Sequence, residues 1–261
     1  MNVMYRVFVL AVALVALSCN ALTPRTYQLE QIHSTYTQEW ARTKLPQEGT
    51  APALGSDREA FKATLAAIRN YKAEHGNTDA VAAHLTVLEG MIHLQSGHPG
   101  MARLLAKDIE DQRQLLESGS GLVTRDQLFA DCYPALVDGW EAITKRSQDP
   151  QVYSEAADRL VETLQAVDAD QRAAAEIDSG GAYIATSAAI FYLWASSLDL
   201  TTPDSKKVAA EKGVAALKPW LSTAEIQAGE AGTAGEAGLN WGSRERFVEW
   251  YEWLYATARG R

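Results

Sequence analysis

Apolar residues recur at helical spacing along almost the whole chain after residue 26, and short segments rich in glycine, proline and serine interrupt them. Residues three, four and seven positions apart share one face of an α-helix, so each stretch predicts a helix with one buried side. The apolar stripes lie at residues 27–40, 61–68, 81–92, 101–109, 129–140, 160–167, 183–198, 210–221 and 247–255. The sequence has no alternating run long enough for a sheet. We therefore predict an all-α domain over residues 27–261, either antiparallel helical hairpins stacked in an array or an irregular bundle.

Local signals place several helix ends. Gly76 follows one apolar stripe and is expected to end that helix in a left-handed conformation. The segment at residues 96–100 is so short that the helices on either side of it are expected to lie antiparallel. Asp149 is expected to cap a helix that begins with Pro150, where the missing amide costs nothing. Residues 229–242 are glycine-rich and predict the longest loop of the chain.

The first residues have the layout of an export signal. Arg6 precedes an unbroken apolar run from Val7 to Leu17, and Ser18 and Cys19 follow. A helix needs about 20 apolar residues to cross a membrane, so this run is too short for a permanent span. The pattern resembles the bacterial lipoprotein signal, which implies that residues 1–18 are removed, that Cys19 is acylated, and that residues 19–26 form a lipidated tether. An ordinary cleaved signal with a coincidental cysteine is the alternative.

Charge and the residue after the cysteine bear on location and partners. By resemblance to enterobacterial lipoproteins, Asn20 points to the periplasmic face of the outer membrane. The net charge is -9, and removal of Arg6 with the signal makes it about -10. Such a surface repels phosphates, so we expect no nucleic-acid binding and no membrane contact except through the lipid anchor.

One hairpin resembles a tetratricopeptide repeat. Gly90 stands at the small position of the first helix of such a repeat, Gly97 at its turn and Ala102 at the small position of its second helix, although Glu89 replaces the leucine usual there. The family implies a surface that binds peptides or proteins without chemistry of its own. The T component of some periplasmic TRAP transporters is similar in architecture, being a lipoprotein of cryptic tetratricopeptide-like hairpins that engages a solute-binding partner.

The histidines do not make a recognisable metal motif. The sequence contains His33, His75, His84, His93 and His98. Glu89 and His93 share a helical face, but no third ligand is spaced to complete a closed site, so we expect neither a metal nor a cofactor.

Catalytic and phosphate-binding patterns are equally weak. Ser179 is followed by Gly180 and Gly181, which are expected to precede a helix and are the nearest approach to an exposed serine with an anion-binding helix start. The paired carboxylates Asp168 with Asp170, and Asp126 with Asp131, would need a cleft to act as acid and base. The glycine-rich segment at residues 229–242 lacks the lysine of a phosphate-binding loop. We therefore expect no enzymatic activity, and an unrecognised hydrolase is the least favoured alternative.

Aromatic residues supply the candidate contact site. Seven tryptophans are present, and most lie on predicted apolar faces. Trp250 and Trp253 cannot both point inward unless the buried face is broad, and Trp241 lies at the end of the glycine-rich segment, so these three are the candidate partner or ligand contacts. The other cysteine, Cys132, lies in an apolar stripe and is expected to be structural.

These features together predict a lipid-anchored envelope protein that acts as a non-catalytic scaffold for an envelope protein partner. The alternative is a small-molecule-binding or transporter accessory lipoprotein, in which aromatic side chains line a pocket.

Overall fold

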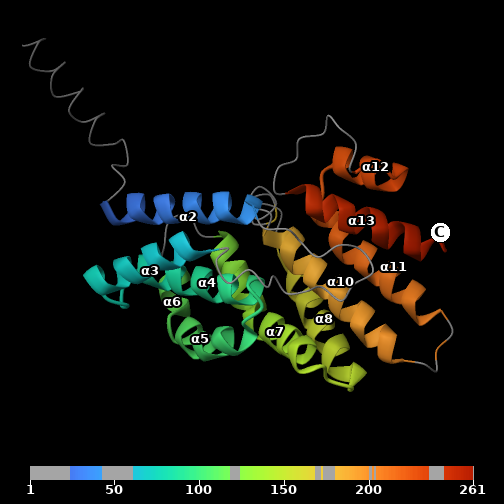
Figure 1. Ribbon diagram of the computed structural model, residues 1–261, viewed down its shortest axis with the longest axis horizontal. Helices are drawn as coiled ribbons and strands as arrows, with labels where there is room; N and C mark the ends of the chain where they lie inside the picture. The colour runs from blue at the N-terminus through green and yellow to red at the C-terminus, as the bar shows by residue number, and fades with distance from the viewer. Residues whose placement is uncertain are drawn as a thin grey trace, which may run out of the picture.

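The computed structural model describes residues 24–42, 61–117, 124–167, 172, 180–199, 202, 204–234 and 244–260. Within these ranges all of the regular secondary structure is helical and no strand occurs, which confirms the predicted all-α class (Figure 1). The helices are α2 (Pro24–Arg42), α3 (Lys62–His75), α4 (Ala80–Gln95), α5 (Pro99–Asp111), α6 (Arg113–Glu117), α7 (Thr124–Lys145), α8 (Pro150–Gln165), α10 (Gly180–Leu198), α11 (Ser205–Leu217), η1 (Lys218–Trp220), α12 (Thr223–Ala231) and α13 (Glu245–Ala258). None of the helices in the described part of the chain is long and apolar enough to cross a membrane.

The predicted helix ends are mostly where the local signals put them. Gly76 follows α3 with a φ of 80°, and Gly97 turns the chain between α4 and α5 with a φ of 74°. The side chain of Asp149 accepts a hydrogen bond from the amide of Gln151 and so caps α8. Asp79 does the same for α4 by accepting from the amide of Ala82 at 2.7 Å. The ends at Gly76, Gly97 and Asp149 follow from backbone conformation or capping within one turn of the helix, which is why the sequence indicates them.

Successive helices pack side by side and form a continuous row. The pairs α4 with α5, α7 with α8, α10 with α11, and α12 with α13 are each in contact, and so are α8 with α10 and α11 with α13. α10 lies near the middle of this row, and its residues from Gly180 to Tyr192 are all buried. Figure 1 shows α2 lying along one side of α3 and α4 rather than as a member of the row.

Gly90 of α4 provides a close approach between α4 and α7. A Cβ atom on Gly90 would overlap the phenol ring of Tyr133 from α7. The Tyr133 hydroxyl passes over Gly90 and donates a hydrogen bond to the carbonyl of Ala102 on α5 at 2.8 Å. Tyr133 therefore joins three helices, and the absence of a side chain at Gly90 makes room for it.

Two segments differ from the sequence expectations. Gly180 and Gly181 are the first residues of α10 instead of preceding it, and Gly181 packs directly against the ring of Trp220, where a Cβ atom would have no room. The predicted loop at residues 229–242 is helical at its start, because α12 continues to Ala231. Ser222 begins α12 with a capping box, in which its hydroxyl accepts from the amide of Glu225 and the Glu225 carboxylate accepts from the amide of Ser222.

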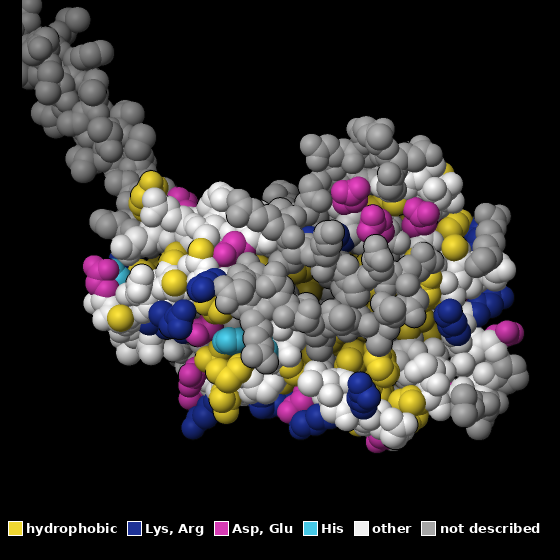
Figure 2. Space-filling view, viewed as in Figure 1, with side chains coloured by type: hydrophobic (Ala, Val, Ile, Leu, Met, Phe, Trp, Pro, Cys, Tyr) yellow, Lys and Arg dark blue, Asp and Glu magenta, His cyan; other side chains and the backbone are white. Residues whose placement is uncertain are grey.

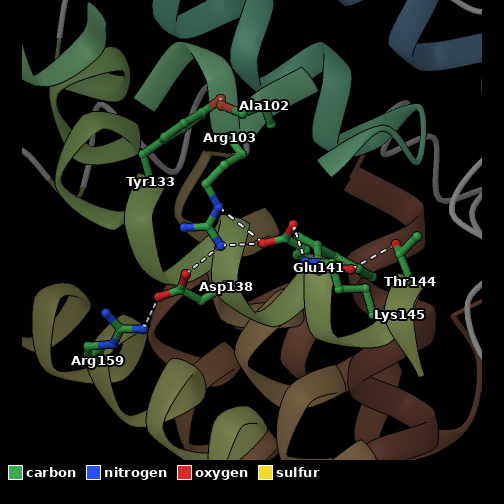
Figure 3. A network of polar contacts seen from close by, with 9 residues as sticks. Ala102, Arg103, Tyr133, Asp138, Glu141, Thr144, Lys145 and Arg159 are labelled. Carbon is green, nitrogen blue, oxygen red and sulfur yellow. Dashed lines mark hydrogen bonds and ion pairs between the residues drawn. The ribbon is translucent and has the colours of Figure 1, made fainter. Parts of the chain in front are cut away.

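An ion-pair network on the surface holds α5, α7 and α8 together (Figure 3). Arg103 of α5 donates to Asp138 at 2.7 Å and to Glu141 at 2.6 Å, both on α7. Arg159 of α8 donates to the other oxygen of Asp138 at 2.6 Å. Hydrogen bonds from Lys145 and Arg103 lower the pKa of Glu141, so that carboxyl stays ionised. Every charge in the network has an opposite neighbour, which indicates a structural role.

Candidate functional site

The predicted contact tryptophans lie partly within the described chain. Trp250 and Trp253 are both half-buried on α13, and their rings meet edge to face with centroids 5.8 Å apart. Tyr251 and Leu254, which alternate with them, are fully buried against the row. The Lys206 ammonium of α11 lies 5.3 Å from the centroid of the Trp253 ring. The structure therefore brings Trp250 and Trp253 together at the C-terminal end of the row, beside α11.

Trp241 and Cys19 lie outside the described residues, as do Ser179, Asp168 and Asp170. No spatial relation between Trp241 and the α13 tryptophans, or between Cys19 and the helical row, is therefore assigned.

The face of α13 next to the tryptophans is acidic. Glu245, Glu249 and Glu252 follow one another at positions i, i+4 and i+7, which share one side of a helix. Burial, together with the nearby charges of Glu245 and Glu252, raises the pKa of Glu249. Figure 2 shows acidic side chains gathered over α12 and α13. An approaching segment would therefore meet half-buried indole rings beside negative charge.

A buried polar cluster joins α2, α4 and α7. The Nδ1 atom of His84 lies 3.0 Å from Oδ2 of Asp126, and both side chains are only 2% exposed. The Nε2 atom of His33, on α2, lies 3.6 Å from the same carboxylate oxygen. The Nε2 atom of His84 has no hydrogen-bond partner among the described residues. Because a carboxylate accepts the proton on Nδ1, a neutral His84 ring presents a buried lone pair at Nε2.

Sequence reasoning did not identify this cluster. His84 lies in a helix whose other inward residues are apolar except for Thr86, and that context is the local sign that its imidazole is buried. The sequence pairs Asp126 only with Asp131 as a candidate acid and base. In the structure Asp131 instead pairs with Arg113, whereas Asp126 faces His84 and His33.

The other residues considered as metal ligands or nucleophiles are Glu89, His93 and Cys132, and their surroundings indicate structural roles. Glu89 accepts a hydrogen bond from Lys72 at 2.6 Å, and burial lowers the pKa of His93. Within the described ranges, no group of three or more His, Cys, Asp or Glu side chains is arranged to hold a metal ion. Cys132 is buried in the core, and its burial raises the pKa of the thiol to about 12. A thiol with so high a pKa is protonated at neutral pH and is a poor nucleophile.

Comparison of this chain with known protein families, curated proteins and solved structures gives no match.

Proposed function

We propose that the protein is a lipid-anchored cell-envelope scaffold, in which Cys19 holds a non-catalytic helical domain at the periplasmic face of the outer membrane. The observation that carries the proposal is the continuous row of paired helices with the half-buried pair Trp250 and Trp253 at one end. A rigid row of helical pairs presents a long surface whose shape does not depend on a ligand. Tryptophan is enriched among the residues that contribute most to protein–protein affinity.

The tetratricopeptide-like positions support the same proposal. Gly97 turns the α4–α5 hairpin, and Ala102 is fully buried. Gly90 admits Tyr133 from α7, so the small residue serves packing of the α4–α5 hairpin on a later helix rather than packing within the hairpin. Packing of each hairpin on its neighbour is the contact on which repeat scaffolds depend.

A transporter-accessory or small-molecule-binding role is the second candidate, and the His84 cluster favours it. A buried imidazole nitrogen without a partner among the described residues is costly unless something donates a hydrogen bond to it. A small polar ligand with an N–H or O–H group would meet that requirement, and so would an ordered water molecule.

Replacing Cys19 by serine tests the anchor. The variant has no thiol to acylate at this position, so the protein is expected to move from the membrane fraction to the soluble envelope fraction. Fractionation followed by immunoblotting measures the distribution. Cys132→Ser is the matched control, because it removes the other cysteine and should leave the protein with the membranes. Retention of the Cys19→Ser protein in the membrane fraction would remove lipid anchoring from the proposal.

Partner capture with Trp253→Ala tests the scaffold. A tagged wild-type chain, purified from gently solubilised membranes, is expected to bring down a near-stoichiometric protein partner. Trp253→Ala is expected to recover at least ten times less partner, because truncation of a central interface tryptophan typically costs 2 kcal/mol or more, about 30-fold in affinity. Leu104→Ala removes an apolar side chain that is 70% exposed on α5 and should leave recovery unchanged.

Two further measurements decide between the candidate functions. Chemical denaturation must show that Trp253→Ala is folded, because its ring packs partly against the core. Equal partner recovery from folded wild-type and Trp253→Ala chains would show that Trp253 is not part of the partner-binding surface. Native mass spectrometry of a lone chain with a discrete extra mass would favour the small-molecule role instead.

A further inference from the structure

The outward face of α13 carries carboxylates that are grouped around Glu249. Residues three and four positions away are neighbours on a helix, and for Glu249 these are Glu245, Arg246, Glu252 and Trp253. Two of the four neighbours therefore carry the same charge as Glu249, and a third is an indole ring. The carboxylates and the two half-buried tryptophans of this helix form one surface, which we call the α13 surface: Glu245, Glu249, Trp250, Glu252 and Trp253.

The carboxylates of the α13 surface repel one another. Burial and the charges of Glu245 and Glu252 raise the pKa of Glu249, although Arg246 acts in the opposite direction. The Arg246 guanidinium contacts α2 instead, where it lies 5.1 Å from the centroid of the Trp40 ring and donates to the Trp40 carbonyl at 3.2 Å. Like charges at this helical spacing destabilise a helix. The folded chain therefore keeps an arrangement of charges that costs it stability.

Other acidic side chains nearby are neutralised by cations of the chain. Glu225 is paired with Arg244 at 2.7 Å, and Glu230 is paired with Lys218 at 3.0 Å. Within the described ranges, by contrast, no ion pair joins Glu245 or Glu249 to a lysine or arginine. Both side chains are exposed, so a cation from another molecule can reach them. The acidic face over α12 and α13 is visible in Figure 2.

The two tryptophans give the α13 surface a second feature that attracts cations. The faces of indole rings carry partial negative charge and bind ammonium and guanidinium groups. The chain itself provides an example, because the Lys206 ammonium lies 5.3 Å from the centroid of the Trp253 ring. Trp253 is one helical turn from Glu249, and its ring meets that of Trp250 edge to face. Apolar area and negative charge are thus presented side by side.

We propose that the α13 surface binds a basic segment of the protein partner, with two or more Lys or Arg side chains about one helical turn apart. These cations lie against Glu245 and Glu249, and apolar side chains of the same segment cover the rings of Trp250 and Trp253. The inference rests on the scaffold function and specifies the chemistry of its partner. Charge complementarity of this kind speeds association and rejects acidic segments.

A pair of synthetic peptides tests the charge preference on the purified full chain, without the envelope partner. Each peptide is an amphipathic helix about five turns long, built from leucine and one charged residue, which is lysine in one peptide and glutamate in the other. Fluorescence anisotropy of the labelled peptides measures the two dissociation constants. The lysine peptide is expected to bind at least about ten times more tightly, because like charges in contact oppose binding. Equal binding of the two peptides would overturn the proposal.

Paired variants separate the α13 surface from the net charge of the chain. Glu245→Gln with Glu249→Gln is expected to weaken binding of the lysine peptide about fivefold, roughly the worth of two exposed charge contacts. Asp108→Asn with Asp111→Asn is the matched control, because it removes two exposed carboxylates from α5 and changes the net charge equally. The control should bind the lysine peptide as the wild type does. An equal loss in both double variants would overturn the proposal, since net charge alone would then attract the peptide.

The stability of the free chain provides a separate readout. Glu249→Gln relieves two like-charge contacts, so it is expected to lower the equilibrium constant for unfolding about twofold. Urea denaturation of the variant and the wild type measures this change. A carboxylate with a structural role would give the opposite result. A Glu249→Gln chain that unfolds more readily than the wild type would therefore contradict the proposal.

Cross-linking of the captured complex locates the contact. A carbodiimide joins a carboxylate to an amine with loss of water, so it links only groups that touch. Mass spectrometry is expected to find a lysine of the partner joined to Glu245, Glu249 or Glu252. A partner whose cross-links to this chain all lie elsewhere would overturn this inference and leave the scaffold function standing. The absence of any captured partner would instead count against the scaffold function, which the peptide titration does not test.

Discussion

Replacing Gly90 by alanine is expected to destabilise the protein by about 1 to 3 kcal/mol, the usual cost of forcing extra volume into a packed core. The added Cβ would overlap the Tyr133 ring, whose hydroxyl is held by the Ala102 carbonyl. The ring is buried between three helices and cannot move without losing that hydrogen bond. The overlap with Tyr133 outweighs the higher helix propensity of alanine, which by itself would stabilise the Gly90→Ala variant by about 1 kcal/mol. Urea denaturation of the two chains measures the difference.

Gly100→Ala is the matched control for Gly90→Ala. Gly100 is also in a helix, the first turn of α5, but a Cβ atom there would have nothing within 4 Å. This variant is expected to be as stable as the wild type or more stable by up to about 1 kcal/mol. Tyr133→Phe removes the hydroxyl that the new methyl group meets. The Tyr133→Phe substitution should therefore destabilise the Gly90→Ala chain less than it destabilises the wild-type chain. A Gly90→Ala chain as stable as the wild type would contradict the packing at this point.

Replacing Arg244 by glutamine is expected to lower the free energy of unfolding by about 3 to 5 kcal/mol at neutral pH, as is typical when one partner of a buried ion pair is removed. Arg244 donates to the two oxygens of Glu225 at 2.7 and 3.0 Å and to the Trp220 carbonyl at 2.8 Å. Glu225 is only 2% exposed, so without Arg244 its charge would be buried beside the Ser222 amide alone. Lys207→Gln removes an exposed charge from α11 and should change stability by less than about 0.5 kcal/mol.

The ion pair between Arg244 and Glu225 makes the free energy of unfolding depend on pH. Burial by itself raises the pKa of Glu225, but hydrogen bonds from Arg244 and the Ser222 amide outweigh it and lower the pKa in the folded protein. The carboxylate therefore stabilises the fold above its unfolded pKa of about 4.3, and this contribution is lost as the pH falls through the lower folded value. In Arg244→Gln burial is expected to raise the folded pKa instead, so the variant gains stability on protonation.

The difference in stability between the two chains should consequently be largest at pH 7 and should narrow below about pH 4.5. Urea denaturation at pH 7 and pH 4 measures it. If Arg244→Gln lowers the free energy of unfolding by less than about 1 kcal/mol at pH 7, or by the same amount at both pH values, then Arg244 does not stabilise the Glu225 charge. The double variant Glu225→Gln with Arg244→Gln should lose less than the sum of the single variants, because no buried charge is left unpaired.

The arrangement of the predicted contact tryptophans could be anticipated only in part. The spacing of Trp250 and Trp253 indicates that they share a broad helix face, because helix periodicity is a property of neighbouring residues. Their edge-to-face contact and the position of Lys206 over Trp253 depend on where α11 packs, and periodicity does not contain that information. Trp241 stays a sequence prediction.

The sequence by itself determined the helical class and most of the helix ends in the described chain. Gly76, Gly97 and Asp149 act through backbone conformation or hydrogen bonds within a single turn, so their effect can be recognised without the fold. The capping box at Ser222 and Glu225 belongs to this class too. It is a readable signal for α12, and the loop predicted at residues 229–242 overlaps only the last residues of that helix.

Only the tertiary structure decided which distant side chains meet. The sequence places Gly180 and Gly181 at a break, but the Trp220 ring makes Gly181 a packing residue inside α10. His84 and Asp126 are 42 positions apart, and Trp40 and Arg246 are 206 apart, and neither residue of either pair has a local pattern that names the other. Burial removes these polar groups from water, and it makes a specific partner necessary. That partner is chosen by the packing of whole helices, which is why the His84 cluster and the contact between Trp40 and Arg246 emerge only from the fold.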